Sequence, residues 1–236
     1  MSARPVAAET TPSDAVLPTD AAPGADGVGT VRVRIVQAAL GSGSLAVIGF
    51  LLVRPGPARG DLSYAATAAG RDAAWVGHLV ECLGYGLAGF GLALATCLIV
   101  RRRGAAWANA GAVMVALGGV LFAAMGYTVG VLGWYATAAD ALPVSAGTAL
   151  LAYAQADPAR LVAADVAGFA LVTLGTLLIC VGLWRSAAVP RVLPVVLAVL
   201  TLAQFVLPQN RALDVDQALL MASFVAVAGF AGRSAR

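Results

Sequence analysis

Most of this sequence consists of long apolar stretches that carry almost no charge. Six of them follow one another after residue 30, and more polar segments, most of which contain arginine, separate them. A helix needs about 20 apolar residues to cross the hydrocarbon core of a bilayer, since each residue advances it by about 1.5 Å. Helices satisfy their own backbone hydrogen bonds in that medium. The pattern therefore predicts an all-α fold, a polytopic transmembrane helix bundle.

We expect six spans within a transmembrane domain at 31–236. The first four stretches are long enough for a full crossing. The last two are shorter than about 20 residues, so they either cross where the bilayer is locally thin or together form one re-entrant hairpin. The expected spans are 33–53, 75–100, 107–135, 159–184, 192–207 and 216–232.

The charge balance excludes two classes of protein. Apolar residues make up 60% of the chain and charged residues 11%, whereas a soluble domain carries about 25% charge. The basic residues stand at the ends of apolar runs and do not form a basic face, so we expect no nucleic-acid partner. All 15 basic residues are arginine, which is typical of a GC-rich genome and suggests an actinobacterial source.

Residues 1–30 have a different composition from the rest of the chain. They are rich in Ala, Pro, Thr, Asp and Gly and contain no apolar core of signal-peptide length. We expect this segment to be a disordered cytoplasmic tail.

The arginines also predict the orientation of the bundle. With the N-terminus inside, nine arginines flank the spans on the inner side and five on the outer side. Cytoplasmic loops carry the excess of basic residues, so we expect both termini in the cytoplasm and a multi-pass protein of the plasma membrane. The tryptophans all fall at expected span ends, where amphipathic rings prefer to lie: Trp75, Trp107, Trp134 and Trp184.

The span at 75–100 carries an unusual polar stripe. Residues three, four and seven apart share one face of a helix, so His78, Glu81, Cys82 and Tyr85 lie together. His78 is the only histidine of the chain. An ionisable residue in a span costs roughly 2.5–3.5 kcal/mol at the helix centre and usually faces the bundle interior.

Three roles are open for this stripe. Burial favours the neutral form of a carboxyl, so Glu81 is either protonated or paired with His78. In either state Glu81 is a candidate catalytic residue. The third role is structural, either one satisfied hydrogen bond between helices or a histidine that simply reaches the headgroups.

Other polar residues fall at the same expected depth. They are Asp165, Tyr127, Thr128 and Gln204. We expect an outward-facing polar pocket whose candidate catalytic residues are His78, Glu81 and Asp165. Tyr85, Tyr127, Thr128 and Gln204 are then candidates for its lining, while Asp214 and Asp216 either join it or are solvated loop residues.

We expect no metal centre and no cofactor. A catalytic zinc site usually has two or three histidines, or cysteine with histidine, and this chain has one histidine. Cys82, Cys97 and Cys180 lie inside apolar runs without a CxxC pair and are interpreted as small apolar residues.

Two further features concern the shape of the bundle. The segment 136–158 is long for a loop, and its sequence SAGTALLAYAQA predicts a short interfacial helix. Glycines cluster on the spans at 75–100 and 107–135, with Gly126 and Gly130 spaced as a GxxxG pair. Small residues at this spacing let two helix backbones approach closely.

The chain resembles a group of small polytopic membrane proteins of unknown function that are common in actinobacteria. The resemblance rests on SYAATAAGRDAAW before the second span, on RRRG after it, and on LWRSAAVPRVLPVVLAV between the fourth and fifth. In the last of these, Trp184, Arg185, Pro190 and Arg191 match the typical pattern. It implies a bundle of six or seven helices and no catalytic residues.

Two functions from different classes remain open. The first is a small carrier or accessory subunit that binds an apolar or amphipathic ligand among membrane lipids, as an oligomer or with a partner membrane subunit. The second is a membrane-embedded enzyme acting on a lipid or isoprenoid, with protonated Glu81 or Asp165 as general acid. This second function is argued by analogy with terpene cyclases that keep carboxyls in an apolar bundle.

Overall fold

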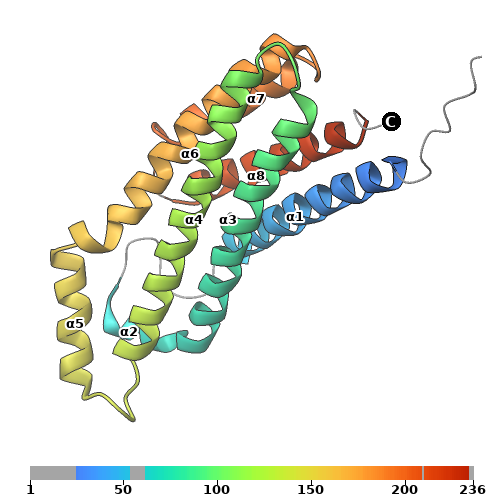
Figure 1. Cartoon of the computed structure of the whole chain (residues 1–236). Coiled ribbons are helices and arrows are strands. Elements are labelled where there is room, and N and C mark those ends of the chain that lie inside the picture. The colour runs from blue at the N-terminus through green and yellow to red at the C-terminus, as the bar shows by residue number, and fades with distance from the viewer. Residues whose placement is uncertain (1–24, 54–61, 209, 234–236) are drawn as a thin grey trace, which may run out of the picture.

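The computed structural model describes residues 25–53, 62–208 and 210–233 of the chain. Helices form almost all of this part, and no strand occurs in it (Figure 1). The all-α prediction is therefore confirmed. The helices are α1 Ala25–Val53, α2 Tyr64–Ala69, α3 Arg71–Ile99, α4 Ala105–Ala136, α5 Val144–Ala156, α6 Ala159–Ser186, α7 Val192–Ala203 and α8 Arg211–Arg233.

Five of the described helices are long and apolar enough to cross a membrane: α1, α3, α4, α6 and α8. By helix length and hydropathy, the protein is a multi-pass integral membrane protein. The expected spans at 33–53, 75–100, 107–135, 159–184 and 216–232 each fall on one of these helices. The segment expected at 192–207 forms only the 12-residue helix α7.

The early end of α7 has a local cause in the sequence. Pro208 has no backbone N–H, and its ring would clash with the carbonyl of residue 204 if the helix continued. The chain instead turns through 204–207 after Ala203. A hydrophobic run shows only that a segment is apolar, so the run at 192–207 did not reveal this stop.

The expected tail at 1–30 lies outside the described residues up to position 24. Residues 25–30 belong to α1, which starts earlier than the apolar run predicts. The short helix expected in the segment 136–158 is confirmed as α5.

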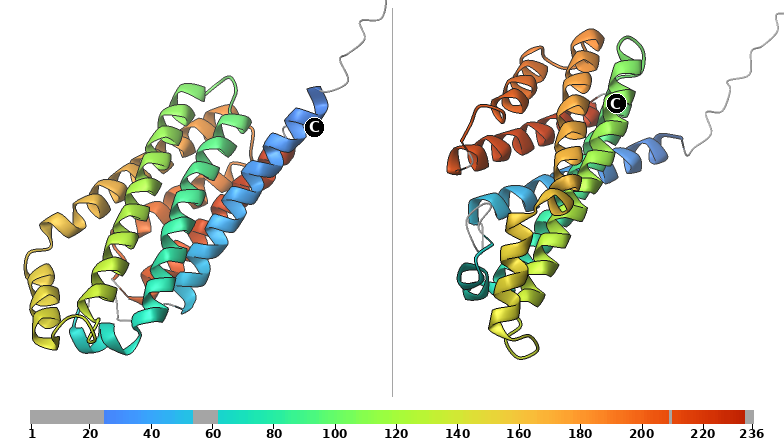
Figure 2. Two further views of the ribbon diagram at one scale, coloured as in Figure 1. Left: turned by 60° about the horizontal axis from the view of Figure 1, so that its bottom comes forward. Right: turned by 90° about the vertical axis from the view of Figure 1, so that its left-hand side faces the viewer.

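The helices are arranged in two rows. In the first row α4 lies between α3 and α6, and in the second α8 lies between α1 and α7. The rows meet where α1 packs on α3 and where α7 packs on α6. Helix α8 touches α3 but packs closely against neither α4 nor α6. The right-hand view of Figure 2 shows α1 and α8 running across the first row. This leaves room between α8 and the first row.

Glycines allow the first row to pack tightly. A Cβ atom on Gly89 of α3 would lie 3.2 Å from the Cα atom of Gly119 of α4, and one on Gly118 of α4 would lie 2.9 Å from the carbonyl oxygen of Gly168 of α6. A larger residue at these contacts would push the helices apart. The backbones of α3, α4 and α6 are therefore in direct contact.

The helices α1, α3, α4 and α6 alternate in direction, so their ends gather in two groups. Helix α6 ends beside the start of α4, because a Cβ atom on Gly104 would lie 2.6 Å from the carbonyl oxygen of Gly182. Helix α8 begins beside the end of α1, where Arg211 donates hydrogen bonds to the carbonyl oxygens of Leu51 and Leu52 at 3.0 and 3.2 Å. The short α7 and the turn after it join these two groups.

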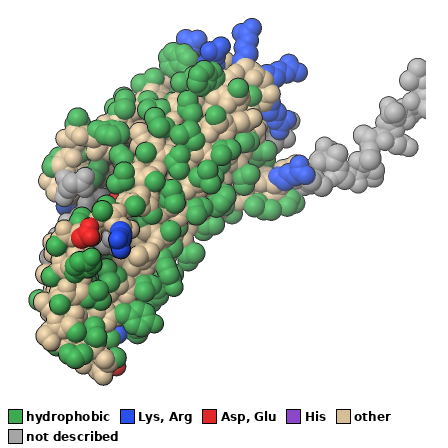
Figure 3. Space-filling model, turned by 60° about the vertical axis from the view of Figure 1, so that its left-hand side comes forward, with side chains coloured by type: hydrophobic (Ala, Val, Ile, Leu, Met, Phe, Trp, Pro, Cys, Tyr) green, Lys and Arg blue, Asp and Glu red, His purple; other side chains and the backbone are tan. Residues whose placement is uncertain are grey.

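The two ends of the bundle differ in charge. Arginines gather at one end, and on the face drawn hydrophobic side chains cover much of the flank between the ends, with a few charged side chains among them (Figure 3). The arginine-rich end contains the α3–α4 connection, with Arg101, Arg102 and Arg103, and the α6–α7 connection, with Arg185 and Arg191. A contiguous apolar flank is what a lipid-facing surface requires.

The glycine contacts predict a position-specific effect on stability. We expect Gly91→Ala to destabilise the folded protein by about 1–3 kcal/mol, because the new Cβ atom would lie 2.7 Å from the Cα atom of Leu40. Thermal unfolding of the purified protein in detergent measures the effect. Gly86→Ala is the control on the same helix, since nothing lies within 4 Å of its Cβ position. Equal unfolding temperatures for the two variants would contradict this packing.

Candidate functional site

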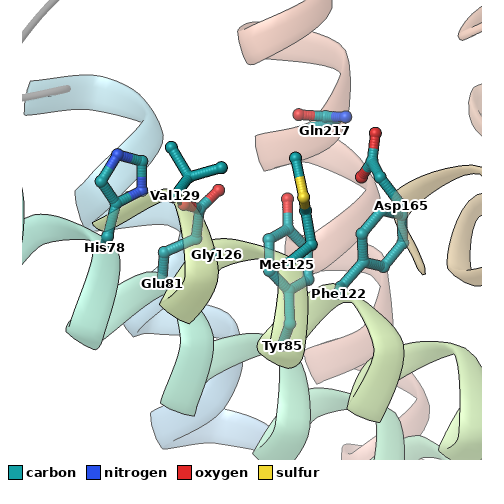
Figure 4. Close-up of a pocket in the computed structure, with 9 residues that line it drawn as sticks. All are labelled: His78, Glu81, Tyr85, Phe122, Met125, Gly126, Val129, Asp165 and Gln217. Carbon is teal, nitrogen blue, oxygen red and sulfur yellow. Dashed lines mark hydrogen bonds and ion pairs between the residues drawn. The ribbon is translucent and has the colours of Figure 1, made fainter. Parts of the chain in front are cut away.

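A cavity of about 150 Å³ lies between the first row and α8. Four helices line it, α3, α4, α6 and α8. It is the place where α8 separates from α4 and α6, so the arrangement of the rows creates it. Its lining residues, drawn in Figure 4, are His78, Glu81, Tyr85, Phe122, Met125, Gly126, Val129, Asp165 and Gln217.

The stripe on α3 supplies one polar wall. The Nδ1 atom of His78 lies 3.1 Å from the Oε2 atom of Glu81, within hydrogen-bond distance and in reach of an ion pair when the imidazole is protonated. The two side chains are 23% and 18% exposed. The His78 ring also packs 5.6 Å from the ring of Phe50. The pair is therefore half-buried and open to the cavity.

One face of α4 forms the floor. Phe122, Met125, Gly126 and Val129 are spaced by three or four residues, so they share that face. A Cβ atom on Gly126 would lie 3.7 Å from the Oε2 atom of Glu81, an ordinary contact distance. The ring of Phe122 stacks on that of Tyr85 at 5.1 Å. The floor is apolar, apart from the phenol of Tyr85 on α3 beside it.

Asp165 of α6 and Gln217 of α8 supply the opposite polar wall. In the close-up, they lie together on one side and the His78–Glu81 pair on the other, with Met125 and Tyr85 between (Figure 4). Both residues make polar interactions of their own. Two separate polar walls thus face one another across an apolar floor.

The cavity lies near one end of the bundle. Asp165 and Gln217 each follow the first residue of their helix by six positions, and His78 follows it by seven. At about 1.5 Å per residue this places all three roughly 10 Å from the helix ends. That end is the one opposite the arginine-rich connections.

The structure brings four of the seven candidate residues to this cavity: His78, Glu81, Tyr85 and Asp165. Gln204 lines a smaller cavity of about 30 Å³ that shares Tyr85, Phe122 and Gln217 with the first. The two cavities are therefore neighbours.

Tyr127 and Thr128 lie elsewhere. They are at the expected depth, but they follow Gly126 on α4 and so point away from the cavity face. Tyr127 lies in a separate groove beside Trp75. The hydroxyl of Thr128 donates a hydrogen bond to the carbonyl oxygen of Ala124 in its own helix at 2.7 Å.

Sequence reasoning missed Gln217 and underestimated two acids. Asp214 and Asp216 were expected either to join the pocket or to be solvated loop residues. They lie in α8 and are only 4% and 5% exposed. Within the described residues, Asp216 Oδ2 has no hydrogen-bond partner. The position of these acids next to an apolar run was the available sign that they could be buried. Only the packing of α8 shows which way their side chains point.

No group of three His, Cys, Asp or Glu side chains in the described residues is arranged to hold a metal ion. The three cysteines are all free. What the cavity offers chemically is hydrogen bonding and charge from carboxyl, imidazole, phenol and amide groups.

The chain matches no family model, no curated protein and no solved structure. Its polytopic helical membrane architecture is the part of the expected resemblance that its structure bears out. Function is therefore argued from the geometry of the site.

The His78–Glu81 pair predicts coupled effects of substitution. We expect Glu81→Leu alone to lower the unfolding temperature in detergent, because His78 loses its partner in an apolar setting. Glu81→Leu combined with His78→Leu should recover part of the loss, with a coupling energy of about 1 kcal/mol. A double-mutant cycle by thermal unfolding measures it. Strictly additive effects would show that the two side chains do not stabilise one another.

Proposed function

We propose that the protein binds the polar end of an amphipathic ligand in this cavity, and that it acts as a small carrier or accessory subunit of the plasma membrane. The observation that carries the proposal is the convergence of polar side chains from α3, α6 and α8 on one partly open cavity. Ionisable residues in membrane spans are costly and usually mark such sites.

The size of the cavity supports a small bound group. An apolar cavity of about 150 Å³ is enough for a benzene-sized molecule, and this one has about that volume. It suits a headgroup of a few heavy atoms, with the apolar remainder of the ligand among the lipids or along the helices. Sites that enclose a whole drug-sized ligand measure about 300–1,000 Å³.

The chemistry of the walls supports a ligand that donates hydrogen bonds. Glu81 and Asp165 offer carboxyl oxygens, and Gln217 offers an amide oxygen. An ammonium or hydroxyl group satisfies such acceptors, whereas a carboxylate has no hydrogen to donate to them. We therefore assign the polar end of the ligand to an amine or an alcohol.

The alternative is an enzyme that uses Glu81 or Asp165 as general acid on a lipid or isoprenoid. Such an enzyme must enclose the chain that it folds or cleaves. The cavity volume does not favour this function, and the binding function is the one that we carry forward.

We further propose six crossings with both termini in the cytoplasm. The positions of the helix ends support this, because α6 ends in one group of helix ends and α8 begins in the other. Helix α7 and the turn after it would then cross as a short helix with an irregular end. Discontinuous helices of this kind occur where transporters line a cavity.

Binding of a donor group predicts selective stabilisation by small probes. In nanodiscs, n-hexylamine and n-hexanol should raise the unfolding temperature, and hexanoate at the same concentration should not. At a probe concentration about ten times Kd the gain is roughly 1.4 kcal/mol, or about 3–6 °C. Glu81→Gln with Asp165→Asn should abolish the preference for the amine, while Asp140→Asn in an exposed loop should keep it. Equal shifts with all three probes would overturn the assignment.

The topology predicts which engineered cysteines react from outside the cell. A membrane-impermeant maleimide should label Ala139→Cys and Ala212→Cys in intact cells and Ala188→Cys only after permeabilisation. All three positions are exposed alanines at helix ends, and the parent protein gives the background from native cysteines. Labelling of Ala188→Cys and Ala212→Cys from the same side would show that α7 does not cross.

A further inference from the structure

A second concave site lies on the outer flank of α3 and α4. It is a groove of about 250 Å³ lined by Trp75, Tyr127, Val131, Trp134 and Tyr135. It shares no lining residue with the cavity described above. Four of its five lining residues are aromatic, and two of these are tryptophans.

Packing holds the aromatic rings of the groove in place. Trp75 lies 5.8 Å from Tyr127, ring centre to ring centre. A Cβ atom on Gly130 would lie 3.2 Å from the Trp75 ring, so the absence of a side chain there lets the ring lie against α4. The ring of Trp134 packs edge-on against Tyr135 at 5.1 Å. The groove is therefore formed before any ligand arrives.

Two opposite charges stand beside the groove at the start of α3. The guanidinium of Arg71 lies 4.0 Å above the ring of Trp134, and its Nε atom donates to the carbonyl oxygen of Trp134 at 3.0 Å. Asp72, the next residue, accepts a hydrogen bond from Trp134 Nε1 at 3.1 Å and is exposed. In the described part of the chain, these contacts use only the Nε atom of Arg71 for hydrogen bonding.

We propose that this groove binds the headgroup and upper acyl chain of a zwitterionic phospholipid. The phosphate accepts hydrogen bonds from the terminal amino groups of Arg71, and the ammonium lies beside the Asp72 carboxylate. The adjacent positive and negative side chains complement the two charges of such a headgroup. A planar guanidinium is well suited to bind phosphate.

The depth of the groove supports the same occupant. It extends along α4 from Tyr135, in the last turn, to Tyr127, eight residues earlier. At about 1.5 Å per residue this is roughly 12 Å, which takes it from the headgroup level into the acyl region. Tyrosine and tryptophan rings are amphipathic and prefer this level of a bilayer. A general aromatic belt at the membrane interface needs neither Arg71 nor Asp72 and does not select a headgroup. Headgroup selectivity therefore distinguishes a lipid-binding site from such a belt.

The experiment measures lipid selectivity at the groove tryptophans. Trp107→Phe and Trp184→Phe remove the fluorescence of the other end of the bundle, so that only Trp75 and Trp134 report. This variant is placed in phosphatidylcholine nanodiscs containing equal fractions of phosphatidylethanolamine and phosphatidylglycerol, one of which is brominated on the upper acyl chain. Brominated phosphatidylethanolamine should quench more than brominated phosphatidylglycerol. The difference should correspond to an apparent local concentration about twofold to fivefold higher, the range expected for exposed charge pairs.

Substitutions on the same background test the two charges. Asp72→Asn should abolish the preference, because the ammonium is the group that distinguishes the two headgroups. Arg71→Gln should lower the quenching by both lipids, because both carry the phosphate. Arg160→Gln, at an exposed arginine of the same end, should change neither result. Arg71 also donates a hydrogen bond to the end of α4, so Arg71→Gln could unfold the protein. In that case Asp72→Asn alone tests the proposed lipid site. Equal quenching by the two lipids, stronger quenching by phosphatidylglycerol, or a preference that survives Asp72→Asn would overturn the proposal.

Discussion

Direct backbone contact between α3, α4 and α6 is the constraint on which the rest of the molecule depends. In a bilayer the hydrophobic effect gives helices no reason to associate, so close packing between small residues has to hold them. The pairs Gly89–Gly119 and Gly118–Gly168 provide it on the two sides of α4. This packing also sets the rotation of α4, which turns Phe122 and Met125 toward α8. The second row cannot follow the first row so closely, and the cavity is the space that remains.

The same arrangement explains how the chain tolerates charge within its spans. Glu81 lies half-buried about three turns from the start of α3, where a charge costs less than at the bilayer centre, and its partner His78 is one turn away on the same helix. An i,i+3 pair needs no second helix to form, so it persists if α8 moves. Asp165 and Gln217 come from different helices, and their approach depends on tertiary packing. One wall of the site is therefore preorganised by helix geometry and the other by the fold.

This difference also marks what sequence could predict. Depth follows from residue position and a fixed helical rise, and Asp165, which was expected level with His78 and Glu81, lines the same cavity as they do. Rotation about the helix axis depends on the partner helices, so Tyr127 and Thr128 share that depth and face elsewhere. Gln217, Asp214 and Asp216 were missed or left open for the same reason, since only the packing of α8 shows that they point inward. The short length of α7 was not predicted, because hydropathy alone does not show where a helix ends within an apolar run.

Gly130 of α4 lies beside one lining residue of the cavity and one of the aromatic groove. A Cβ atom there would lie 3.0 Å from the Cβ atom of His78 and 3.2 Å from the ring of Trp75, one on the cavity side and one on the groove side. Both neighbours contact α4 closely here, although each also borders its own open site. If the proposed lipid and the proposed ligand both bind, a displacement of Trp75 would act on the part of α4 that contacts His78. Any effect of one on the affinity of the other would then be reciprocal and equal in size.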